Sequence, residues 1–567
     1  MEIDFTSDGE ELLIKYTPRE ADVLGLVGGL RRLGDFFTSS KNMSVLLQLQ
    51  ELFNGNITYS ERLIEWGINE RKKRERQPGT DETLRGFLQH QIDGSNWLTN
   101  AENAILCFPA GTGKTATALR AVDVSRPFPC LVICPNTLKR TWKAECEKWS
   151  PDLRVTILEG TAAQRKKALK TDADIYVVNY ESLPSLSHIG RYGSLPVETK
   201  NSALNEIPWK AIIVDECQRI VNAKAKSTRC VKELSRGKSV QYRWALSATP
   251  IRATPADFWS LMNFFEPTVW TSRSKFIDMF CETKNNFWGG LELIGIRKDR
   301  KELFDKIIDL YMMTVVKEDV LPDLPPIVYS TRYVPLAGKQ LKQYKQMLDD
   351  MIIKTDEGEY IIATSPLTAS ARLSQAAAAT LEVNEDEVIL RTPSCKIDAV
   401  VELAEEMADE QFVGFASSKK LVNLCADKLR SLGYKVVLIT GDQDTIERQY
   451  NIESFQAGRA QILLMTEAGS EGVTLTAAST LVFIQLPWSY VTYYQASQRV
   501  HRIGSKGNRV QIINLVSENT IEEKMIEALD RKDGHLSDLL KSKKEMSKWL
   551  TEKEPAESKN VQMRLKL

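Results

Sequence analysis

Short runs of apolar residues alternate along most of the chain with longer stretches of helical periodicity. A short apolar run bounded by polar or small residues is typical of a strand that is buried on both faces of a parallel sheet. Six such runs precede residue 250, at 105–107, 131–134, 155–158, 175–178, 211–214 and 242–246. The segments between them, including 116–122 and 142–149, predict helices. This alternation indicates an α/β fold built on a parallel sheet.

A second series of apolar runs follows a proline-rich segment at 321–326, which is the clearest linker signal in the chain. Its strands are predicted at 412–415, 436–439, 462–465, 481–484 and 510–513. Residues 251–320 and 336–395 lack the alternation and are interpreted as mainly helical insertions. The chain therefore predicts two parallel-sheet lobes, each with a helical insertion.

Smaller parts lie outside the two series. Residues 1–80 predict a strand at 12–16 and helices at 21–37, 45–53 and 60–76. The predicted division is an accessory region at 1–80, a first lobe at 81–326, a second lobe at 327–532 and a basic tail at 533–567. The tail is interpreted as a solvated helix with a frayed end, with contact to the DNA backbone as the alternative.

Composition limits the possible partners and compartments. A chain of 567 residues is too long for a single core. Its 75 Lys and Arg balance 75 Asp and Glu, so a nucleic-acid site would have to be a local basic groove. Nine cysteines without a CxxC pair predict core thiols in a reducing compartment. The acidic start and the lack of a membrane-length apolar run predict a soluble intracellular protein.

The stretch PAGTGKT at 109–115 follows the first predicted strand and opens a helix. Its glycines let backbone N–H groups approach phosphates, and the helix N-terminus adds its positive end. Lys114 would reach the β- and γ-phosphates of ATP, and the Thr115 hydroxyl would hold Mg²⁺. The nucleotide-binding residues predicted here are Gly111, Thr112, Gly113, Lys114 and Thr115. Phe108 stands where the strict pattern has Gly, so a turn that only caps a helix is the alternative.

Two acidic residues, Asp215 and Glu216, directly follow the strand at 211–214. At the end of a parallel strand, carboxylates lie at the edge of the sheet where ligands bind. We expect Asp215 to bind Mg²⁺ through water, and Glu216 to position and deprotonate the attacking water. A simple helix cap is the alternative for such a pair.

Gln91 precedes the glycine-rich stretch on an amphipathic segment. A carboxamide can pair in bidentate fashion with adenine N6 and N7. Gln91 is therefore a candidate adenine-binding residue, with an ordinary polar surface position as the alternative.

The second lobe carries two arginines in the segment QASQRVHRIG at 495–504. On a helix, Gln495, Arg499 and Arg502 would lie on one face. Two guanidinium groups suit the charge that develops on a γ-phosphate, whereas a salt-bridged surface is the alternative. His501 would point elsewhere and is interpreted as structural.

These motifs together resemble the Swi/Snf-type ATPases of helicase superfamily two over roughly residues 84–530. The resemblance rests on PAGTGKT (109–115), VICPNTLKRTW (132–142), VVNYESL (177–183), IIVDECQRIVNAKAKS (212–227), LSATPI (246–251), VKEDVLPDLPP (316–326), SCKIDAVVEL (394–403), TEAGSEGVTLTAA (466–478) and QASQRVHRIGS (495–505). It implies two RecA-like lobes, helical insertions, hydrolysis of Mg-ATP and tracking along DNA.

The resemblance also implies roles for individual residues. Gln91 resembles the adenine-binding residue of the family, Asp215 the metal-binding acid and Glu216 the hydrolytic acid. The residues implied in catalysis are Lys114, Glu216, Arg499 and Arg502, the arginines as arginine fingers. The segments implied in contacts to a DNA strand are 135–138, 180–183 and 469–476.

The chain departs from the usual family pattern at several positions. Cys217 and Gln218 stand where the family usually has Ala and His, and Ser247-Ala248-Thr249-Pro250 replaces Thr-Gly-Thr-Pro. Thr314 and Val315 replace an expected arginine pair. These differences leave the ATP chemistry intact but weaken an assignment to chromatin remodelling, and a compact prokaryotic or viral member of the family is expected.

The leading hypothesis is a DNA-stimulated ATPase that tracks along double-stranded or branched DNA in replication, recombination or repair, acting as a monomer. A strand-separating DNA helicase is the first alternative. A nucleotide-switched DNA clamp with little turnover is the second, and the presence of Glu216, Arg499 and Arg502 counts against it.

Overall fold

The computed structural model describes residues 1–74, 86–251, 254–285, 291–356, 358–363, 366–385, 387–407, 410–470, 473–505, 507–527 and 529. They form two compact units. Within the described ranges, the first unit comprises residues 1–109 and 113–320, and the second comprises residues 110–112 and 321–529. The predicted tail at 533–567 lies outside the described residues.

A seven-stranded, all-parallel sheet forms the centre of the first unit. Its strands, in spatial order, are β14 (Met312–Thr314), β6 (Asn103–Cys107), β11 (Tyr242–Ser247), β10 (Ala211–Asp215), β7 (Cys130–Cys134), β9 (Ile175–Asn179) and β8 (Val155–Ile157). The six predicted strands of this lobe are confirmed. The edge strand β14 is too short to give a sequence signal.

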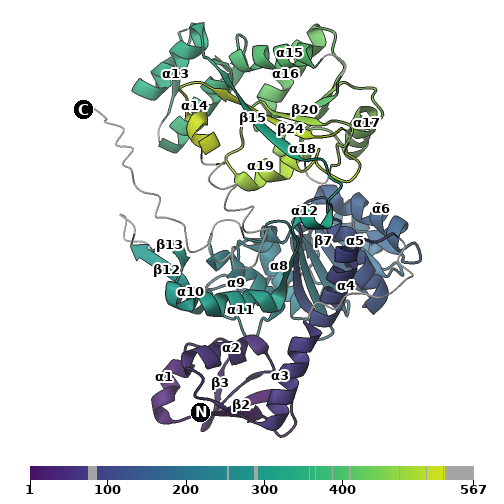
Figure 1. Cartoon of the computed structure of the whole chain (residues 1–567), viewed down its shortest axis with the longest axis vertical. Coiled ribbons are helices and arrows are strands. Elements are labelled where there is room, and N and C mark those ends of the chain that lie inside the picture. The colour runs from purple at the N-terminus through teal and green to yellow at the C-terminus, as the bar shows by residue number, and fades with distance from the viewer. Residues whose placement is uncertain are drawn as a thin grey trace. The chain divides into compact units, whose positions relative to one another are not determined.

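Helices cover both faces of this sheet (Figure 1). They are α4 (Gln89–Ala101), α5 (Lys114–Ser125), α6 (Lys139–Trp149), α8 (Lys226–Ser235), α9 (Ala256–Phe265) and α11 (Lys301–Tyr311). Successive residues of each strand point to opposite faces of the sheet. Ile213 packs in the cluster that includes Leu119 and Trp142, whereas its buried neighbours Ile212 and Val214 point to the other face. Burial on both faces explains why the strands are continuous apolar runs.

The N-terminal region is a separate small sheet rather than mainly helical. Its elements are β1 (Glu2–Phe5), β2 (Glu11–Lys15), α1 (Ala21–Leu24), β3 (Arg31–Leu33), β4 (Phe36–Ser40), α2 (Met43–Leu52), β5 (Thr58–Tyr59) and α3 (Glu61–Lys73). The strand at 12–16 and the later helices are confirmed, but the helix predicted over 21–37 is wrong. That helix ends at Leu24, and Gly29 and Gly34 adopt positive φ angles of 80° and 59° that turn the chain into a β-hairpin.

A six-stranded, all-parallel sheet forms the centre of the second unit. In spatial order its strands are β15 (Ile327–Val334), β24 (Val510–Ser517), β23 (Thr480–Phe483), β20 (Phe412–Phe415), β22 (Ile462–Met465) and β21 (Val436–Ile439). The five predicted strands are confirmed, and with the first sheet they confirm the α/β fold class. Strand β15 escaped prediction because it is a largely exposed edge strand with polar residues along it.

The helices of the second unit are α13 (Gly338–Asp350), α14 (Pro366–Ala378), α15 (Cys395–Glu406), α16 (Lys419–Ser431), α17 (Thr445–Gln456), α18 (Glu467–Ser470) and α19 (Tyr490–Ser497). The segment predicted as a helical insertion also contains two hairpins, β16–β17 (Ile352–Lys354, Tyr360–Ile362) and β18–β19 (Thr380–Asn384, Glu387–Arg391). A further hairpin, β12–β13 (Cys281–Asn285, Leu291–Ile296), lies in the insertion of the first unit.

The nine cysteines form no disulfide, and eight of them are buried, in agreement with the predicted core thiols. Burial raises the pKa of the Cys230 thiol to about 12 and that of Cys146 to about 11. No helix among the described residues is long and apolar enough to span a bilayer.

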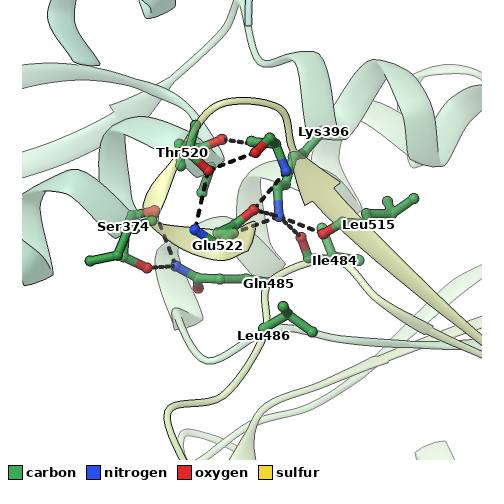
Figure 2. A network of polar contacts seen from close by, with 12 residues as sticks. Ser374, Lys396, Ile484, Gln485, Leu486, Leu515, Thr520 and Glu522 are labelled. Atoms are coloured by element: carbon green, nitrogen blue, oxygen red, sulfur yellow. Dashed lines mark hydrogen bonds and ion pairs between the residues drawn. The ribbon is translucent and has the colours of Figure 1, made fainter. Parts of the chain in front are cut away.

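A buried ion pair ties the start of α15 to the segment after β24 (Figure 2). Lys396 Nζ donates to the carbonyl oxygens of Ile484 and Leu515, each at 2.8 Å, and lies 2.6 Å from Glu522 Oε2. Both side chains are fully buried. Burial lowers the pKa of Lys396, whereas the charge of Glu522 acts in the opposite direction. Glu522 and the two carbonyl oxygens therefore stabilise the charged form of Lys396 against the cost of burial.

Replacing Lys396 with Met should leave the Glu522 carboxylate buried without its cation. We expect the free energy of unfolding of the second unit to fall by about 3–5 kcal/mol, measured by urea denaturation of the full chain. Adding Glu522→Gln should recover part of the loss, because an uncharged amide oxygen can still accept the hydrogen bond that Ser517 N–H now donates at 2.9 Å.

The exposed pair Lys419–Asp442, at 2.8 Å, provides the control. Lys419→Met should cost at most about 1 kcal/mol, because solvent screens an exposed pair. Equal losses for the Lys396 and Lys419 variants would show that the buried pair adds nothing.

Candidate nucleotide site and arginine segment

Five neighbouring strands of the first sheet lead into motifs of the family resemblance, and two of them, β6 and β10, are followed by the predicted P-loop and acidic pair. These strands are β6, β11, β10, β7 and β9, which are adjacent and parallel. Because parallel strands point the same way, the loops at their carboxyl ends meet at one edge of the sheet. Sequence segments as distant as 108–113 and 215–216 are thereby brought to the same edge.

The loop between β6 and α5 has the backbone geometry of a phosphate cradle. Gly111 and Gly113 have φ angles of +83° and +87°, a region that residues with a Cβ rarely enter. Gly113 is the N-cap of α5, so the helix begins directly at Lys114 and Thr115. Lys114 Nζ donates to the carbonyl oxygen of Phe108 at 3.0 Å. Phe108, which replaces the usual Gly, is fully buried.

The amide of Gln91 lies against this loop. Gln91 is buried in the first turn of α4, and its Oε1 accepts a hydrogen bond from Leu88 N–H at 3.0 Å. A Cβ at Gly113 would lie 2.2 Å from Gln91 Nε2. The structure thus brings Gln91 and the loop together, and it requires glycine at position 113.

Asp215 ends β10 as a carboxylate with 4% exposure. Its Oδ2 accepts a hydrogen bond from Trp142 Nε1 at 2.8 Å, and its Oδ1 accepts one from Glu216 N–H at 2.9 Å. Burial and, secondarily, the charge of Glu216 raise the pKa of Asp215 to about 6, against the lowering effects of Trp142 and Lys114. A buried acid that is costly to ionise is suited to a nearby cation. Trp142 was not predicted as part of the site.

A chain of hydrogen bonds extends from Glu216 to the next strand. Gln218 Nε2 donates to Glu216 Oε2 at 2.6 Å, and Ser247 Oγ donates to Gln218 Oε1 at 2.7 Å. Thr249 N–H in turn donates to Ser247 Oγ at 2.8 Å. Glu216 itself has a φ of +52°, a left-handed conformation that is uncommon for a residue with a side chain. The bridging role of Gln218 could not be predicted, because only the fold brings Ser247 next to it.

In the second unit, Arg499 and Arg502 do not share a helix with Gln495. The helical stripe predicted over 495–502 is wrong, because α19 ends at Ser497. Beyond it the chain turns, and the Arg499 carbonyl accepts a hydrogen bond from Leu475 N–H at 2.9 Å instead of continuing the helix.

The two arginines instead belong to a folded segment beside residues 474–475. Arg502 Nη1 donates to Thr474 Oγ1 at 2.8 Å, and its Nε donates to the Gln498 carbonyl at 3.1 Å. Arg499 is buried. His501 Nε2 lies 2.9 Å from the Pro325 carbonyl oxygen.

The residues at the sheet edge fit a nucleotide with its metal ion. The loop has two glycines in the conformations that a cradle needs, Lys114 lies at its end, and Asp215 is a buried carboxylate near a helix N-terminus. No group of three or more His, Cys, Asp or Glu side chains among the described residues could hold a metal ion by itself. A cation here would therefore need phosphate and water oxygens besides protein ligands.

Two RecA-like parallel-sheet lobes, one with a P-loop followed by an acidic pair, are typical of the helicase-type ATPases. The chain belongs to the SNF2-related family: residues 90–380 match the model of the SNF2-related domain, and residues 395–504 match that of the helicase conserved C-terminal domain. The family resemblance is confirmed, and the prediction of an ATPase is confirmed at the level of this family.

The individual relatives share about a quarter of their aligned residues with this chain. The chain is 25% identical over 476 residues to the ISWI chromatin-remodeling complex ATPase ISW1 of Saccharomyces cerevisiae, covering 78% of this chain and 39% of that protein. It is 26% identical over 471 residues to the human SWI/SNF-related matrix-associated actin-dependent regulator of chromatin subfamily A member 1, covering 78% and 42%. The chain thus spans about two fifths of the length of these relatives.

Among solved structures, the Sulfolobus solfataricus SWI2/SNF2 ATPase core in complex with dsDNA is 24% identical, with 84% of this chain and 99% of that chain covered and a TM-score of 0.39.

Gly113→Ala should weaken ATP binding at least tenfold, because the new Cβ would both strain a φ of +87° and collide with Gln91 Nε2. Titration with a fluorescent ATP analogue measures the effect. Gly55→Ala, at a φ of +73° with no atom within 4 Å of the new Cβ, has the strain without the collision. The Gly55 variant should bind normally, and unchanged binding by the Gly113 variant would argue against this cradle.

Proposed function

We propose that this chain is an ATP-driven motor that tracks along double-stranded or branched DNA and remodels DNA structures or protein–DNA complexes. The observation that carries the proposal is that β6 and β10, parallel strands on either side of β11, carry the P-loop and the acidic pair Asp215–Glu216 at their carboxyl ends. Family membership adds the second lobe with its arginine segment. Replication, recombination and repair are the processes proposed for it.

In this proposal residues 81–326 act as the ATP-binding lobe and residues 327–532 as the arginine-bearing lobe. The loop N–H groups and Lys114 hold the ATP phosphates, and Gln91 binds adenine. Thr115 and Asp215, the latter through water, hold the Mg²⁺, which supplies charge neutralisation at the phosphates.

Glu216 is the residue proposed to orient and deprotonate the attacking water. Its carboxylate is fixed by Gln218 at 2.6 Å, and its backbone is held in a left-handed turn directly after β10. Positioning of this kind is the main contribution that a protein makes to phosphoryl transfer. Arg499 and Arg502 are proposed to stabilise the charge that develops on the transferred phosphoryl group.

The DNA track is proposed to run over the loops at 135–138, 180–183 and 469–476. In the described structure the first two follow β7 and β9, as the short helical turns Asn136–Leu138 and Tyr180–Ser185. Tyr180 hydroxyl donates to the Asp215 carbonyl oxygen at 2.5 Å, which joins one of these loops to the catalytic strand. A movement of this loop on DNA binding can thus reach the acidic pair directly.

The relatives named as chromatin-remodeling proteins support DNA as the substrate. We propose action as a monomer in an intracellular compartment.

Glu216→Gln should retain ATP binding and lose turnover by about a hundredfold or more, because the amide cannot accept the proton of the attacking water. A steady-state phosphate-release assay with saturating duplex DNA gives the rate, and a fluorescent ATP analogue gives the affinity. Glu147→Gln, on the exposed face of α6, is the control and should leave both unchanged. Near-normal turnover of the Glu216 variant would remove the assigned hydrolytic residue.

Duplex DNA should stimulate hydrolysis more than RNA, and its binding should tolerate any sequence and weaken steeply with salt. Both follow from contacts to backbone phosphates, since a motor that steps along any sequence cannot depend on base edges. The chain should displace the third strand of a triplex and fail to unwind a simple tailed duplex. Efficient unwinding without triplex displacement would favour the strand-separating helicase, and DNA binding with almost no ATP turnover would favour the clamp.

A further inference from the structure

A cavity of about 490 Å³ lies in the first unit, apart from the residues assigned to ATP. It is lined by residues of α8, α9, the start of α10 (Arg273–Phe280) and the segment 190–193. Its volume is in the range of small-molecule sites. A hydrogen bond holds part of the cavity lining in place: Arg229 Nε donates to the Gly190 carbonyl oxygen at 2.6 Å and so attaches the segment 190–193 to α8.

The wall of this cavity is strongly cationic. Five basic side chains line it, namely Arg191, Arg229, Lys232, Arg236 and Arg273, and the described lining residues include no Asp or Glu. Arg236 forms an ion pair with Glu233 at 3.0 Å, and the Glu233 carboxylate lies beside the lining residue Gly190. Such a concentration of positive charge without internal carboxylates favours an anionic occupant.

Lys232 is the least satisfied member of the group. It is 5% exposed, and its Nζ makes no hydrogen bond within the described part of the chain. The ammonium group lies 4.1 Å from the ring centre of Trp259, which also lines the cavity. Burial, together with the charges of Arg236 and Arg273, lowers the pKa of Lys232 to about 7. A buried amine without a hydrogen-bond acceptor is costly to the fold and is suited to an incoming anion.

Neutral polar side chains, Thr271, Ser272 and Ser274, also line the cavity. Ser272 is the N-cap of α10, so the first turn of this helix, with Arg273 and Ser274, borders the cavity. A helix N-terminus adds N–H groups and a positive end that phosphate oxygens prefer. Arginine side chains and a capped helix start therefore line the same cavity.

We propose that this cavity binds the phosphate groups of a small phosphorylated molecule, a polyphosphate or phosphate ester, at a site distinct from the P-loop. The guanidinium groups of Arg191 and Arg273 would hold the oxygens, since Arg229 already donates to the carbonyl oxygens of Gly190 and Pro196. Lys232 would gain the acceptor that it lacks. The indole of Trp259 also lines the cavity and offers an apolar surface to the organic part of an ester.

The test uses inorganic diphosphate as the probe and the full chain with Lys114→Ala, so that the P-loop does not contribute. Calorimetric melting is compared with and without diphosphate, at ionic strength matched with chloride. We expect diphosphate to raise the melting temperature of the first unit by at least about 2 °C, as for a ligand that binds only the folded state. Adding Lys232→Met should abolish this shift and raise the melting temperature of the ligand-free chain, since a buried unpaired charge is removed.

Lys238→Met, at an exposed position just beyond α8, is the matched control and should keep the full shift. Arg273→Met, at the start of α10, should reduce the shift. The proposal is overturned if diphosphate gives no shift, or if the shift survives Lys232→Met. It is also overturned if duplex DNA, rather than diphosphate, loses affinity in the Lys232 variant, because the cavity would then be a contact of the DNA track. Without Lys114→Ala, Lys232→Met should retain DNA-stimulated hydrolysis, which separates this site from the motor function.

Discussion

The common direction of neighbouring strands is the constraint on which the candidate site depends. The P-loop and the acidic pair lie about a hundred residues apart in sequence, and only the parallel pairing of β6, β11 and β10 brings their ends to one edge. A parallel sheet must be buried on both faces, so it requires the helices that the intervening segments form. The same packing that hides the apolar strands thus leaves their carboxyl ends as the place where polar groups can gather.

Charged side chains are buried at three places in the structure, and their partners differ from place to place. Lys396 and Glu522 neutralise one another, and the remaining donors of the ammonium group meet carbonyl oxygens. Asp215 accepts two hydrogen bonds, and burial raises its pKa. Lys232 makes no hydrogen bond within the described structure and has a lowered pKa. The first arrangement stabilises a fold, whereas the other two cost free energy that a ligand can recover.

The sequence predicts those features that local pattern determines. Buried strands appear as apolar runs, and the P-loop follows from residue types at fixed spacing around Lys114. Features that depend on tertiary contacts escaped prediction. The end of α19 at Ser497 is fixed partly by Leu475, and the pairing of Lys396 with Glu522 joins residues 126 positions apart. In the N-terminal region, the helical periodicity after residue 21 was misleading because glycines turn the chain into a hairpin.

The departure of the second motif from the family pattern has a physical explanation in Gln218. The position must donate to the Glu216 carboxylate and accept from the Ser247 hydroxyl at the same time, and a carboxamide has both groups on one planar head. A histidine can do the same only in one neutral tautomer, and it loses its acceptor when protonated. A serine at 247 suits the amide, because its oxygen both donates to Gln218 and accepts from Thr249 N–H. The amide at 218 therefore makes the link between the Glu216 carboxylate and the next strand independent of pH in the range where imidazole titrates.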